Sequence, residues 1–405
     1  MTNRLLQIAF LTVLGATTQA SADVNPYITK VYDFVPAPGQ FVNTMPEYDQ
    51  GDSKADIIDK VAECLVGTFY YTGSNMNEPS NGLISLGAFG GYVVFGFDHP
   101  IVNVAGAYDF RVIGNAAQSD AYAGMKGGSA EPGIVMVMRD DNGNGLPDDT
   151  WYELAGSEHN NAETQKNFTI TYYRPNEDKE KEPDPQDNTI SDATYIKYNG
   201  SATGYLPRNA FHAQPYWPQW YDAKDDTMTF TGTRLPNNGQ NMSSGTGTAA
   251  YWFLRAFDWG YVDNEPNTTD PGLKIDWAVD ADGNPVHLDE IHFVKVYSSM
   301  IQYCGQVGET STEVGGAIDL HPDAVSALDH AEAHAQALRI TACDATSLHF
   351  IAPANACATV LTANGSVALQ SQAVSGENSL CISNLCPGIY LLNVGNQTCK
   401  FVKSN

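Results

Sequence analysis

The chain has 405 residues, which predicts two or three domains, and its hydrophobic content of 42% is enough for a sizeable core. Its net charge of −26 repels phosphate backbones and argues against nucleic acid as a partner. The acidic excess suits solubility outside the cell and binding of hard cations. The 36 glycines and 21 prolines indicate many turns, as in an all-β protein.

The first 22 residues are expected to be a secretory signal peptide. Arg4 gives a basic start, and an apolar run over residues 5–14 is too short to span a bilayer. Ala20-Ser21-Ala22 supplies small residues at the offset that cleavage requires. Because the mature chain holds no other long apolar stretch, we expect no transmembrane segment. The protein is therefore expected to be secreted or on the cell surface.

One short helix is expected near the N-terminus. Ser53 has the character of an N-cap residue, and Gly67 ends the pattern. Between them, apolar side chains recur at helical spacing at Ile57, Ile58, Val61 and Leu65.

From residue 82 onward the pattern predicts short strands separated by turns. Strands are expected within 83–103, 108–116, 133–139, 150–156, 248–257, 276–279 and 287–299. The segments 133–139 and 150–156 flank an acidic turn and predict a hairpin. Residues 174–191 are charged and rich in proline, so they predict an exposed loop.

These elements favour a β-sandwich body over residues 23–325 and a small separate β-domain over 346–405. Residues 326–345 are expected to form a linker or a short helix between them. Five of the seven cysteines fall in the last stretch, where disulfides would stabilise a domain this small. Because seven is odd, at least one thiol stays unpaired within the chain.

The acidic turn RDDNGNGLPDDTWYEL has the spacing of a cation loop. Asp140, Asn142 and Asn144 stand at positions 1, 3 and 5, Gly145 at 6 and Asp148 at 9. Position 12 is tryptophan, so the segment is no EF-hand; it resembles the Asp-rich calcium loops of thrombospondin type 3 repeats. We expect a structural Ca²⁺ ion, because this spacing exceeds what a turn requires. The predicted ligands are Asp140, Asn142, Asn144, the Leu146 carbonyl, Asp148 and Asp149.

The alternative is a hairpin turn whose Asn, Asp and Gly residues suit left-handed backbone angles. A shorter version, Asp280, Asp282 and Asn284, is expected to be such a plain turn.

An aromatic stretch, FHAQPYWPQWY (211–221), packs six rings and two prolines into a short segment. Rigid rings of this kind form apolar platforms that suit sugar or corrin faces. The alternative is a core plug that covers a sandwich edge, and both interpretations stay open. The predicted ligand-binding residues are Tyr216, Trp217, Trp220 and Tyr221.

Several acidic and histidine residues are candidates for catalysis or for metal binding. A glycosidase needs two carboxylates at a fixed gap, but nothing in the sequence brings together Glu131, Glu153, Glu158 and His159. His287 and His292 are five apart and thus on opposite faces of a strand. His330 and His334 share a helix face, yet an exposed linker is favoured over a zinc pair. The sequence holds no GxSxG, HExxH, P-loop or GxGxxG motif.

The tail LCISNLCPGIYLLNVGNQTCKFVKSN resembles the C-terminal sorting domain of type IX (Por) secretion cargo in Bacteroidetes. Matching positions are Asn364, Gly365, Leu385, Pro387, Gly388, Ile389, Tyr390, Val394, Lys400, Val402 and Lys403. The resemblance covers about the last 60 residues and departs from the family in its many cysteines. It implies a C-terminal Ig-like β-sandwich and export through the Gram-negative outer membrane.

The body resembles a group of secreted Bacteroidales cell-surface proteins. The resemblance rests on YVVFGFDHPIVN, AYDFRVIGNA, EPGIVMVMRDDNGNGLPDDTWYELAGSE and IDWAVDADGNPVHLDEIHFVKVYSS, and spans about residues 45–325. It implies a jelly-roll sandwich akin to galactose-binding domains. Several members lie near outer-membrane vitamin B12 uptake systems, which hints at the ligand.

These observations favour a secreted or cell-surface binding protein with a calcium-stabilised loop, whose ligand is a glycan or a cobamide. One alternative is a glycan-active hydrolase that uses a glutamate pair. Another is a structural surface-layer component with no ligand beyond calcium and its neighbours. Uptake or secretion machinery of the outer membrane is an expected partner under the resemblance.

Overall fold

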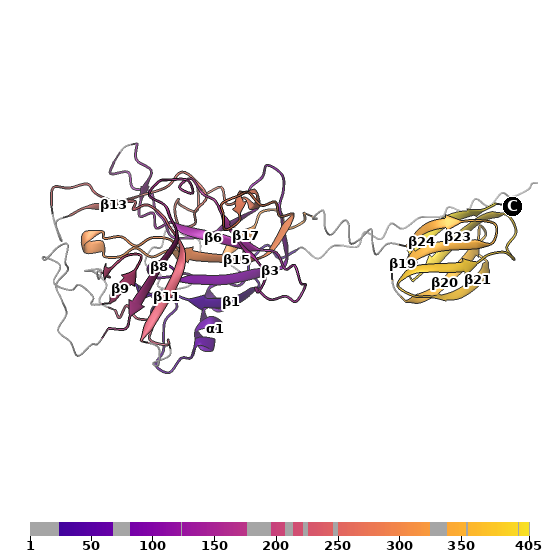
Figure 1. Cartoon of the computed structure of the whole chain (residues 1–405), viewed down its shortest axis with the longest axis horizontal. Coiled ribbons are helices and arrows are strands. Elements are labelled where there is room, and N and C mark those ends of the chain that lie inside the picture. The colour runs from indigo at the N-terminus through magenta and orange to yellow at the C-terminus, as the bar shows by residue number, and fades with distance from the viewer. Residues whose placement is uncertain are drawn as a thin grey trace, which may run out of the picture.

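The computed structural model describes residues 24–67, 82–122, 124–175, 196–206, 214–221, 226–245, 250–324, 338–353, 355–395 and 397–404. The predicted signal peptide, most of the 174–191 loop, most of the predicted linker and the pair His330 and His334 lie outside these residues. The described chain is mostly β-strands in antiparallel sheets, with one α-helix within the described residues (Figure 1). The all-β prediction is confirmed at this level.

Helix α1 (Lys54–Leu65) forms where the sequence predicts it. The Ser53 hydroxyl accepts a hydrogen bond from the Asp56 amide, and the Asp56 carboxylate accepts one from the Ser53 amide at 2.8 Å. Two of the amides at the start of the helix thus have partners. Ile57, Val61 and Leu65 recur every four residues and are buried. They fix the helix against the body through its apolar face.

The centre of the body is a six-stranded antiparallel sheet. Its strands, in spatial order, are β1 (Lys30–Val35), β3 (Tyr92–Val102), β15 (Glu290–Ser298), β6 (Gly133–Met138), β7 (Trp151–Leu154) and β14 (Ala278–Val279). Figure 1 shows β3, β15 and β6 side by side. In β15 nearly every residue is buried, as expected of a strand covered on both faces. This sheet and α1 share the largest apolar core of the body.

Smaller sheets surround the central one. A four-stranded sheet has the order β10 (Gly204–Tyr205), β9 (Lys197–Gly200), β8 (Gln165–Tyr173) and β11 (Thr227–Arg234). A three-stranded sheet has the order β12 (Gly239–Asn241), β13 (Trp252–Arg255) and β5 (Gly127–Gly128). Two strand pairs are β16 (Glu313–Val314) with β2 (Ile84–Ser85), and β17 (Ala317–Asp319) with β4 (Phe110–Val112). Two 3-10 turns are η2 (Ile275–Trp277) and η3 (Gly305–Val307).

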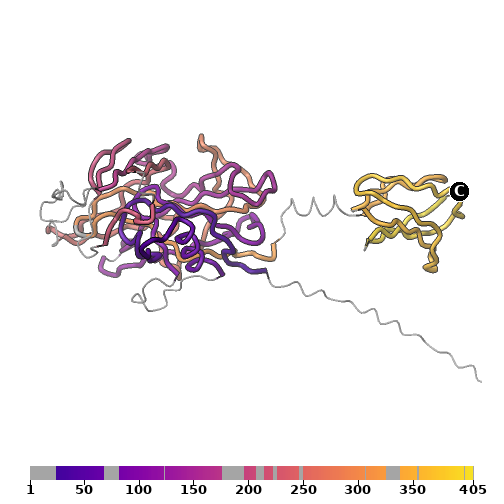
Figure 2. Tube along the Cα trace, turned by 90° about the horizontal axis from the view of Figure 1, so that it is seen from below, coloured from indigo at the N-terminus to yellow at the C-terminus, as the bar shows by residue number. Residues whose placement is uncertain are grey.

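Residues 338–404 form a set of strands with a core of its own (Figure 2). One sheet has the order β18 (Arg339–Cys343), β19 (Ser347–Ala352) and β22 (Gly376–Cys381). The other has the order β21 (Val367–Ala373), β20 (Ala356–Thr362), β23 (Gly388–Val394) and β24 (Gln397–Lys403). Side chains from both sheets, among them Leu348, Phe350, Val360 and Leu392, share that core. The seven cysteines all lie in the described residues and form no disulfide there, so the tail has none of the disulfides that its cysteines suggested.

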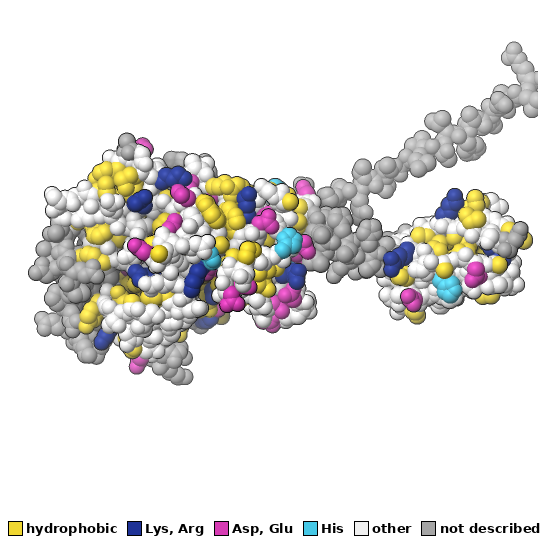
Figure 3. Space-filling model, turned by 45° about the horizontal axis from the view of Figure 1, so that its top comes forward, with side chains coloured by type: hydrophobic (Ala, Val, Ile, Leu, Met, Phe, Trp, Pro, Cys, Tyr) yellow, Lys and Arg dark blue, Asp and Glu magenta, His cyan; other side chains and the backbone are white. Residues whose placement is uncertain are grey.

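Two surface properties bear on partners. No helix of the described residues is both long enough and apolar enough to cross a membrane. On the face shown in Figure 3, basic side chains are scattered among acidic ones and form no continuous basic patch.

Candidate functional site

The predicted hairpin is present and carries the acidic turn at its tip. Strands β6 and β7 pair antiparallel, with Met138 opposite Trp151 and Met136 opposite Glu153. The turn between them, residues 139–150, is mostly exposed. Trp151 is the first residue after the turn, so the shape of the turn sets where that ring lies.

The side-chain oxygens of the turn accept hydrogen bonds from N–H groups of the same turn. The two Asp140 carboxylate oxygens accept the amides of Asn144 and Gly145 at 3.1 and 2.8 Å, and the Asn144 side-chain oxygen accepts the Leu146 amide at 2.8 Å. The Asn142 and Asn144 side chains both reach Asp148. Gly145 has a φ of 71°, which permits the sharp bend.

Asp149 belongs to the same network, because its carboxylate accepts the amide of Asp141 at 3.0 Å. Leu146 contributes its carbonyl, which accepts the Asp148 amide at 2.9 Å, while its side chain is exposed. All six predicted ligands are thus gathered around one loop, and their oxygens are the donors that Ca²⁺ prefers. A plain turn makes the same hydrogen bonds, so the calcium ion stays a prediction.

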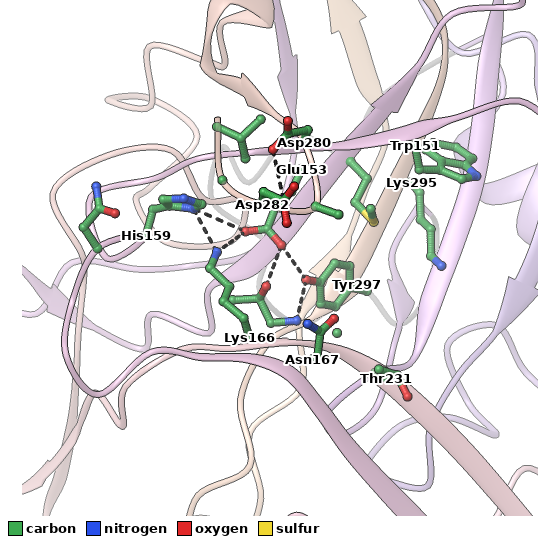
Figure 4. Close-up of a pocket in the computed structure, with 18 residues that line it drawn as sticks. Trp151, Glu153, His159, Lys166, Asn167, Thr231, Asp280, Asp282, Lys295 and Tyr297 are labelled. Atoms are coloured by element: carbon green, nitrogen blue, oxygen red, sulfur yellow. Dashed lines mark hydrogen bonds and ion pairs between the residues drawn. The ribbon is translucent and has the colours of Figure 1, made fainter. Parts of the chain in front are cut away.

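Behind the hairpin lies a cavity of about 500 Å³, here called the polar pocket (Figure 4). Strands β7, β8, β11 and β15 and the turn at 280–283 supply its walls. The side chains that define it are Trp151, Glu153, His159, Lys166, Asp280, Asp282 and Tyr297.

Glu153 lies at the centre of a hydrogen-bond network in the polar pocket. Its Oε1 atom accepts the Lys166 ammonium at 2.9 Å, and its Oε2 atom accepts the Thr233 hydroxyl at 2.7 Å. The Tyr297 hydroxyl donates to the same Oε2 at 3.2 Å and accepts the Thr233 amide at 3.1 Å. Both oxygens of the carboxylate are therefore engaged by groups from three neighbouring strands, and this holds the side chain rigidly.

His159 completes this network. Its Nδ1 lies 2.8 Å from the Lys166 ammonium and 3.6 Å from Glu153 Oε1. Burial, and then the Lys166 charge, lower the pKa of His159, so its imidazole is neutral at neutral pH and accepts from Lys166. At the other side of the polar pocket, burial lowers the pKa of Lys295, whose ammonium lies 4.1 Å from the Tyr92 ring centre. The polar pocket thus combines acceptors, donors and one neutral imidazole.

The turn at Asp280 is held by hydrogen bonds of its own, and its reading as a plain turn stays a prediction. One Asp280 carboxylate oxygen accepts the amides of Asp282 and Asn284 at 2.9 and 2.8 Å. Residues 280–283 line the polar pocket together with His159, a placement that the local sequence does not predict (Figure 4).

The aromatic residues predicted to bind a ligand lie mainly in the core. Tyr216, Trp217 and Trp220 are 4%, 5% and 8% exposed, and Tyr221 is half-buried. Trp220 stacks on Phe34. Their burial matches the core-plug alternative, because little ring surface is presented to solvent. Contact with a ligand stays a prediction for these four residues.

The other candidate catalytic and metal-binding residues lie in different parts of the structure. Of the four glycosidase candidates, the structure joins Glu153 to His159, while Glu158 pairs with Ser157 and Asn161. Glu131 takes part in a different acidic group.

The two strand histidines have separate partners. The exposed His287 lies 3.2 Å from Asp289, and His292 accepts the Asp140 amide at 3.2 Å. Sequence reasoning missed Lys166, Tyr297 and Thr233, since nothing local marks them as neighbours of Glu153.

No protein-family model matches the chain, and a comparison with curated proteins found no significant match.

Proposed function

We propose that this is a secreted or cell-surface binding protein whose polar pocket binds a hydroxyl-rich glycan. The observation that carries the proposal is the rigid Glu153 network beside Trp151 in one cavity. Sugar hydroxyls donate to carboxylates and accept from ammonium groups, and an indole ring covers the apolar face of a sugar. Acceptors at Asp280 and Asp282 and a donor at Lys166 supply both kinds of contact.

Binding is favoured over hydrolysis by the state of Glu153. A glycosidase needs one carboxyl group free to donate a proton and a second to attack or to activate water. Both Glu153 oxygens are already occupied by Lys166, Thr233 and Tyr297. The hydrolase alternative therefore needs those contacts to break when substrate enters.

The Asp140–Asp149 turn supports this proposal from outside the polar pocket. A Ca²⁺ ion held by its six oxygen donors would fix the end of β7, and with it Trp151. The ion would be structural, because the turn holds no group placed to react with a ligand.

The proposals about fold and export rest on the family resemblances of the body and of the C-terminal tail. We propose a jelly-roll arrangement akin to galactose-binding domains for the body, and an Ig-like sandwich for residues 338–404, which begins earlier than the predicted 346 because β18 lies within the predicted linker. The last 60 residues would act in type IX export, with outer-membrane machinery as the partner. A cobamide remains the second ligand class under this proposal, and a calcium-dependent surface-layer component remains the non-ligand alternative.

The test is titration calorimetry of the chain against a glycan panel and a cobamide. Trp151→Ala and Glu153→Gln should each weaken the affinity for the bound glycan at least about 10-fold, since the first removes the ring and the second disturbs the network that positions Lys166. Glu163→Gln is the matched control, because Glu163 is exposed and lies outside the polar pocket. Equal affinity of all three variants and the unmodified chain would refute the polar pocket as the site. Release of sugar products that stops in Glu153→Gln would favour the hydrolase.

The calcium proposal has its own test. Melting with and without calcium should show a rise in melting temperature that Asp140→Ala/Asp148→Ala reduces, because an ion that binds only the folded chain stabilises it. An identical calcium-dependent rise in both proteins would make the turn a plain one.

A further inference from the structure

Three carboxylates that are remote in sequence meet inside the body. Glu131, Asp263 and Glu313, here called the carboxylate cluster, each place an oxygen within 4.8 Å of the other two. Asp263 and Glu313 are 3% and 2% exposed, and Glu131 is half-buried. In the part of the chain that the structure describes, this is the one group of three acidic, cysteine or histidine side chains gathered so closely.

The backbone holds the carboxylate cluster in place. Asp263 Oδ1 accepts the amides of Asn115 and Ala116 at 2.7 and 2.8 Å, and its Oδ2 accepts the Glu313 amide at 2.9 Å. Asp263 has a φ of 52°, a left-handed conformation that few non-glycine residues adopt.

The Glu131 amide donates to the Asp263 carbonyl at 2.8 Å, which ties two of the three segments together directly. The arrangement is therefore specified by several separate contacts, and does not depend on side-chain rotamers alone.

A second observation comes from Glu309, which is 1% exposed. One of its oxygens accepts the Gln40 amide, but the other, Oε2, is buried and has no hydrogen-bond partner. Gln40 links Glu309 to the carboxylate cluster, because its carbonyl accepts the Ser85 hydroxyl at 3.0 Å and Ser85 lies opposite Glu313 in the β2–β16 pair. A buried carboxylate oxygen with nothing to bind is costly, and such sites mark a missing partner.

The basic side chains of the described residues do not balance these charges. Among the described residues, no lysine, arginine or histidine forms an ion pair with Glu131, Asp263, Glu309 or Glu313. Buried carboxylates of this kind are stabilised either by protons or by a cation.

We propose that Glu131, Asp263 and Glu313 bind a structural Ca²⁺ ion, with Glu309 as a further carboxylate beside it. Oxygen-only donors select a hard cation. Calcium fits the spacing, because its ligand oxygens lie about 2.4 Å from the ion and so up to roughly 4.8 Å apart. The half-buried Glu131 is the member of the carboxylate cluster nearest to solvent. This site is separate from the Asp140–Asp149 turn and does not rest on the proposed glycan function.

The proposal is tested in a background that disables the turn. Asp140→Asn/Asp148→Asn changes exposed or half-buried groups in the turn and leaves the carboxylate cluster intact. After chelator treatment, this variant should bind one Ca²⁺ ion per chain in equilibrium dialysis at about 1 mM free calcium or below. Its melting temperature should rise by roughly 5 °C when calcium is added.

A second pair of changes, Glu131→Gln/Glu313→Gln, should abolish both the bound ion and the rise in melting temperature. Glu290→Gln is the matched control: Glu290 is also buried, with an unpartnered oxygen, but lies in β15 outside the carboxylate cluster. That variant should keep the ion.

Two outcomes would overturn the proposal. One is a turn-disabled chain that binds no calcium and melts alike with calcium and chelator, which would mean that protons neutralise the carboxylate cluster. The other is retention of the ion in the double glutamine variant. If the double variant does not fold, the ion count in the turn-disabled chain decides the question by itself.

Discussion

The Asp140–Asp149 turn and the carboxylate cluster gather the same chemical groups in opposite surroundings. The turn is mostly exposed, and its acidic side chains are bonded by amides of their own loop. The carboxylate cluster is buried, and its members come from segments up to 182 positions apart, from Glu131 to Glu313. Water screens the turn whether or not an ion is present, whereas the carboxylate cluster has to be neutralised inside the protein.

The two acidic groups differ mainly in which partners hydrogen-bond or neutralise their carboxylates, and less in how many carboxylates they contain. In this molecule a carboxylate is satisfied by backbone amides, by a cationic side chain, by water, or, under our proposal, by an ion. The following predictions separate these cases, from the largest expected effect to the smallest.

The largest effect is expected at Asp263. Asp263→Ala removes the acceptor of three amides, those of Asn115, Ala116 and Glu313. Each amide left buried without a partner costs on the order of 1–3 kcal/mol, so the free energy of unfolding should fall by at least about 3 kcal/mol. Urea denaturation in the presence of chelator measures the loss without any ion.

Asp263→Asn is the control for that experiment. It removes the same negative charge, and so relieves the same repulsion, but retains a side-chain acceptor and tolerance of the left-handed backbone. It should be clearly more stable than Asp263→Ala. Equal stability of the two variants would mean that charge, and not amide satisfaction, sets the role of Asp263.

A smaller effect is expected where a buried carboxylate has a cationic partner. Asp319 is 2% exposed and lies 2.9 Å from His99 Nε2, while Asp98 lies 2.7 Å from His99 Nδ1. The hydrogen bond to Asp319 is the main reason that the pKa of His99 is raised. His99→Gln should lower the free energy of unfolding by on the order of 2 kcal/mol at pH 5.5 or so, because the charge-assisted bonds are lost.

The pH dependence fixes the sign of that effect. Since the folded-state pKa is the higher one, the stabilisation by His99 is fully present below its unfolded pKa of about 6.5. It declines as the pH rises through the folded pKa. The difference between the unmodified chain and His99→Gln should therefore shrink between mildly acidic and mildly alkaline pH. A difference that grows with pH would contradict the ion-pair assignment.

The helix cap should give about half that effect. Ser53→Ala removes the hydroxyl that accepts the Asp56 amide at the start of α1, and should cost about 1 kcal/mol in thermal or urea unfolding. Ser53→Thr keeps a hydroxyl acceptor and should lose much less. Equal losses in the two variants would show that the hydroxyl contributes little there.

The smallest effect is expected in the turn when calcium is absent. Asp148 is exposed, so in chelator Asp148→Ala should change the free energy of unfolding by less than about 0.5 kcal/mol. A loss several times larger in chelator would mean that the turn is held by its own hydrogen bonds and needs no ion.

What the sequence predicts well is local. Ser53 and the spacing of Ile57, Val61 and Leu65 predict α1 within a residue or two, because capping and periodicity act over one turn of helix. The β6–β7 hairpin is predicted for the same reason, since both strands flank one turn.

What the sequence does not predict depends on contacts between distant segments. Glu131 is one acidic residue among many in the sequence, and only contacts between distant segments bring it to Asp263 and Glu313. Likewise Glu153 meets Tyr297, 144 positions away, because β7 and β15 both pair with β6 in the central sheet. Trp217 and Trp220 show the converse: an aromatic stretch has the same composition whether it faces solvent or the core, so burial alone separates the two interpretations.

Strand β15 gives the two proposed sites a common mechanical element. Tyr297, its penultimate residue, bonds Glu153 in the polar pocket, and the chain then runs on directly to Glu309 and Glu313. Thermodynamic linkage requires that any factor by which the ion changes glycan affinity equals the factor by which the glycan changes ion affinity. Under both proposals, a coupling factor above one would make the affinity for the ligand rise with the free calcium concentration around the protein.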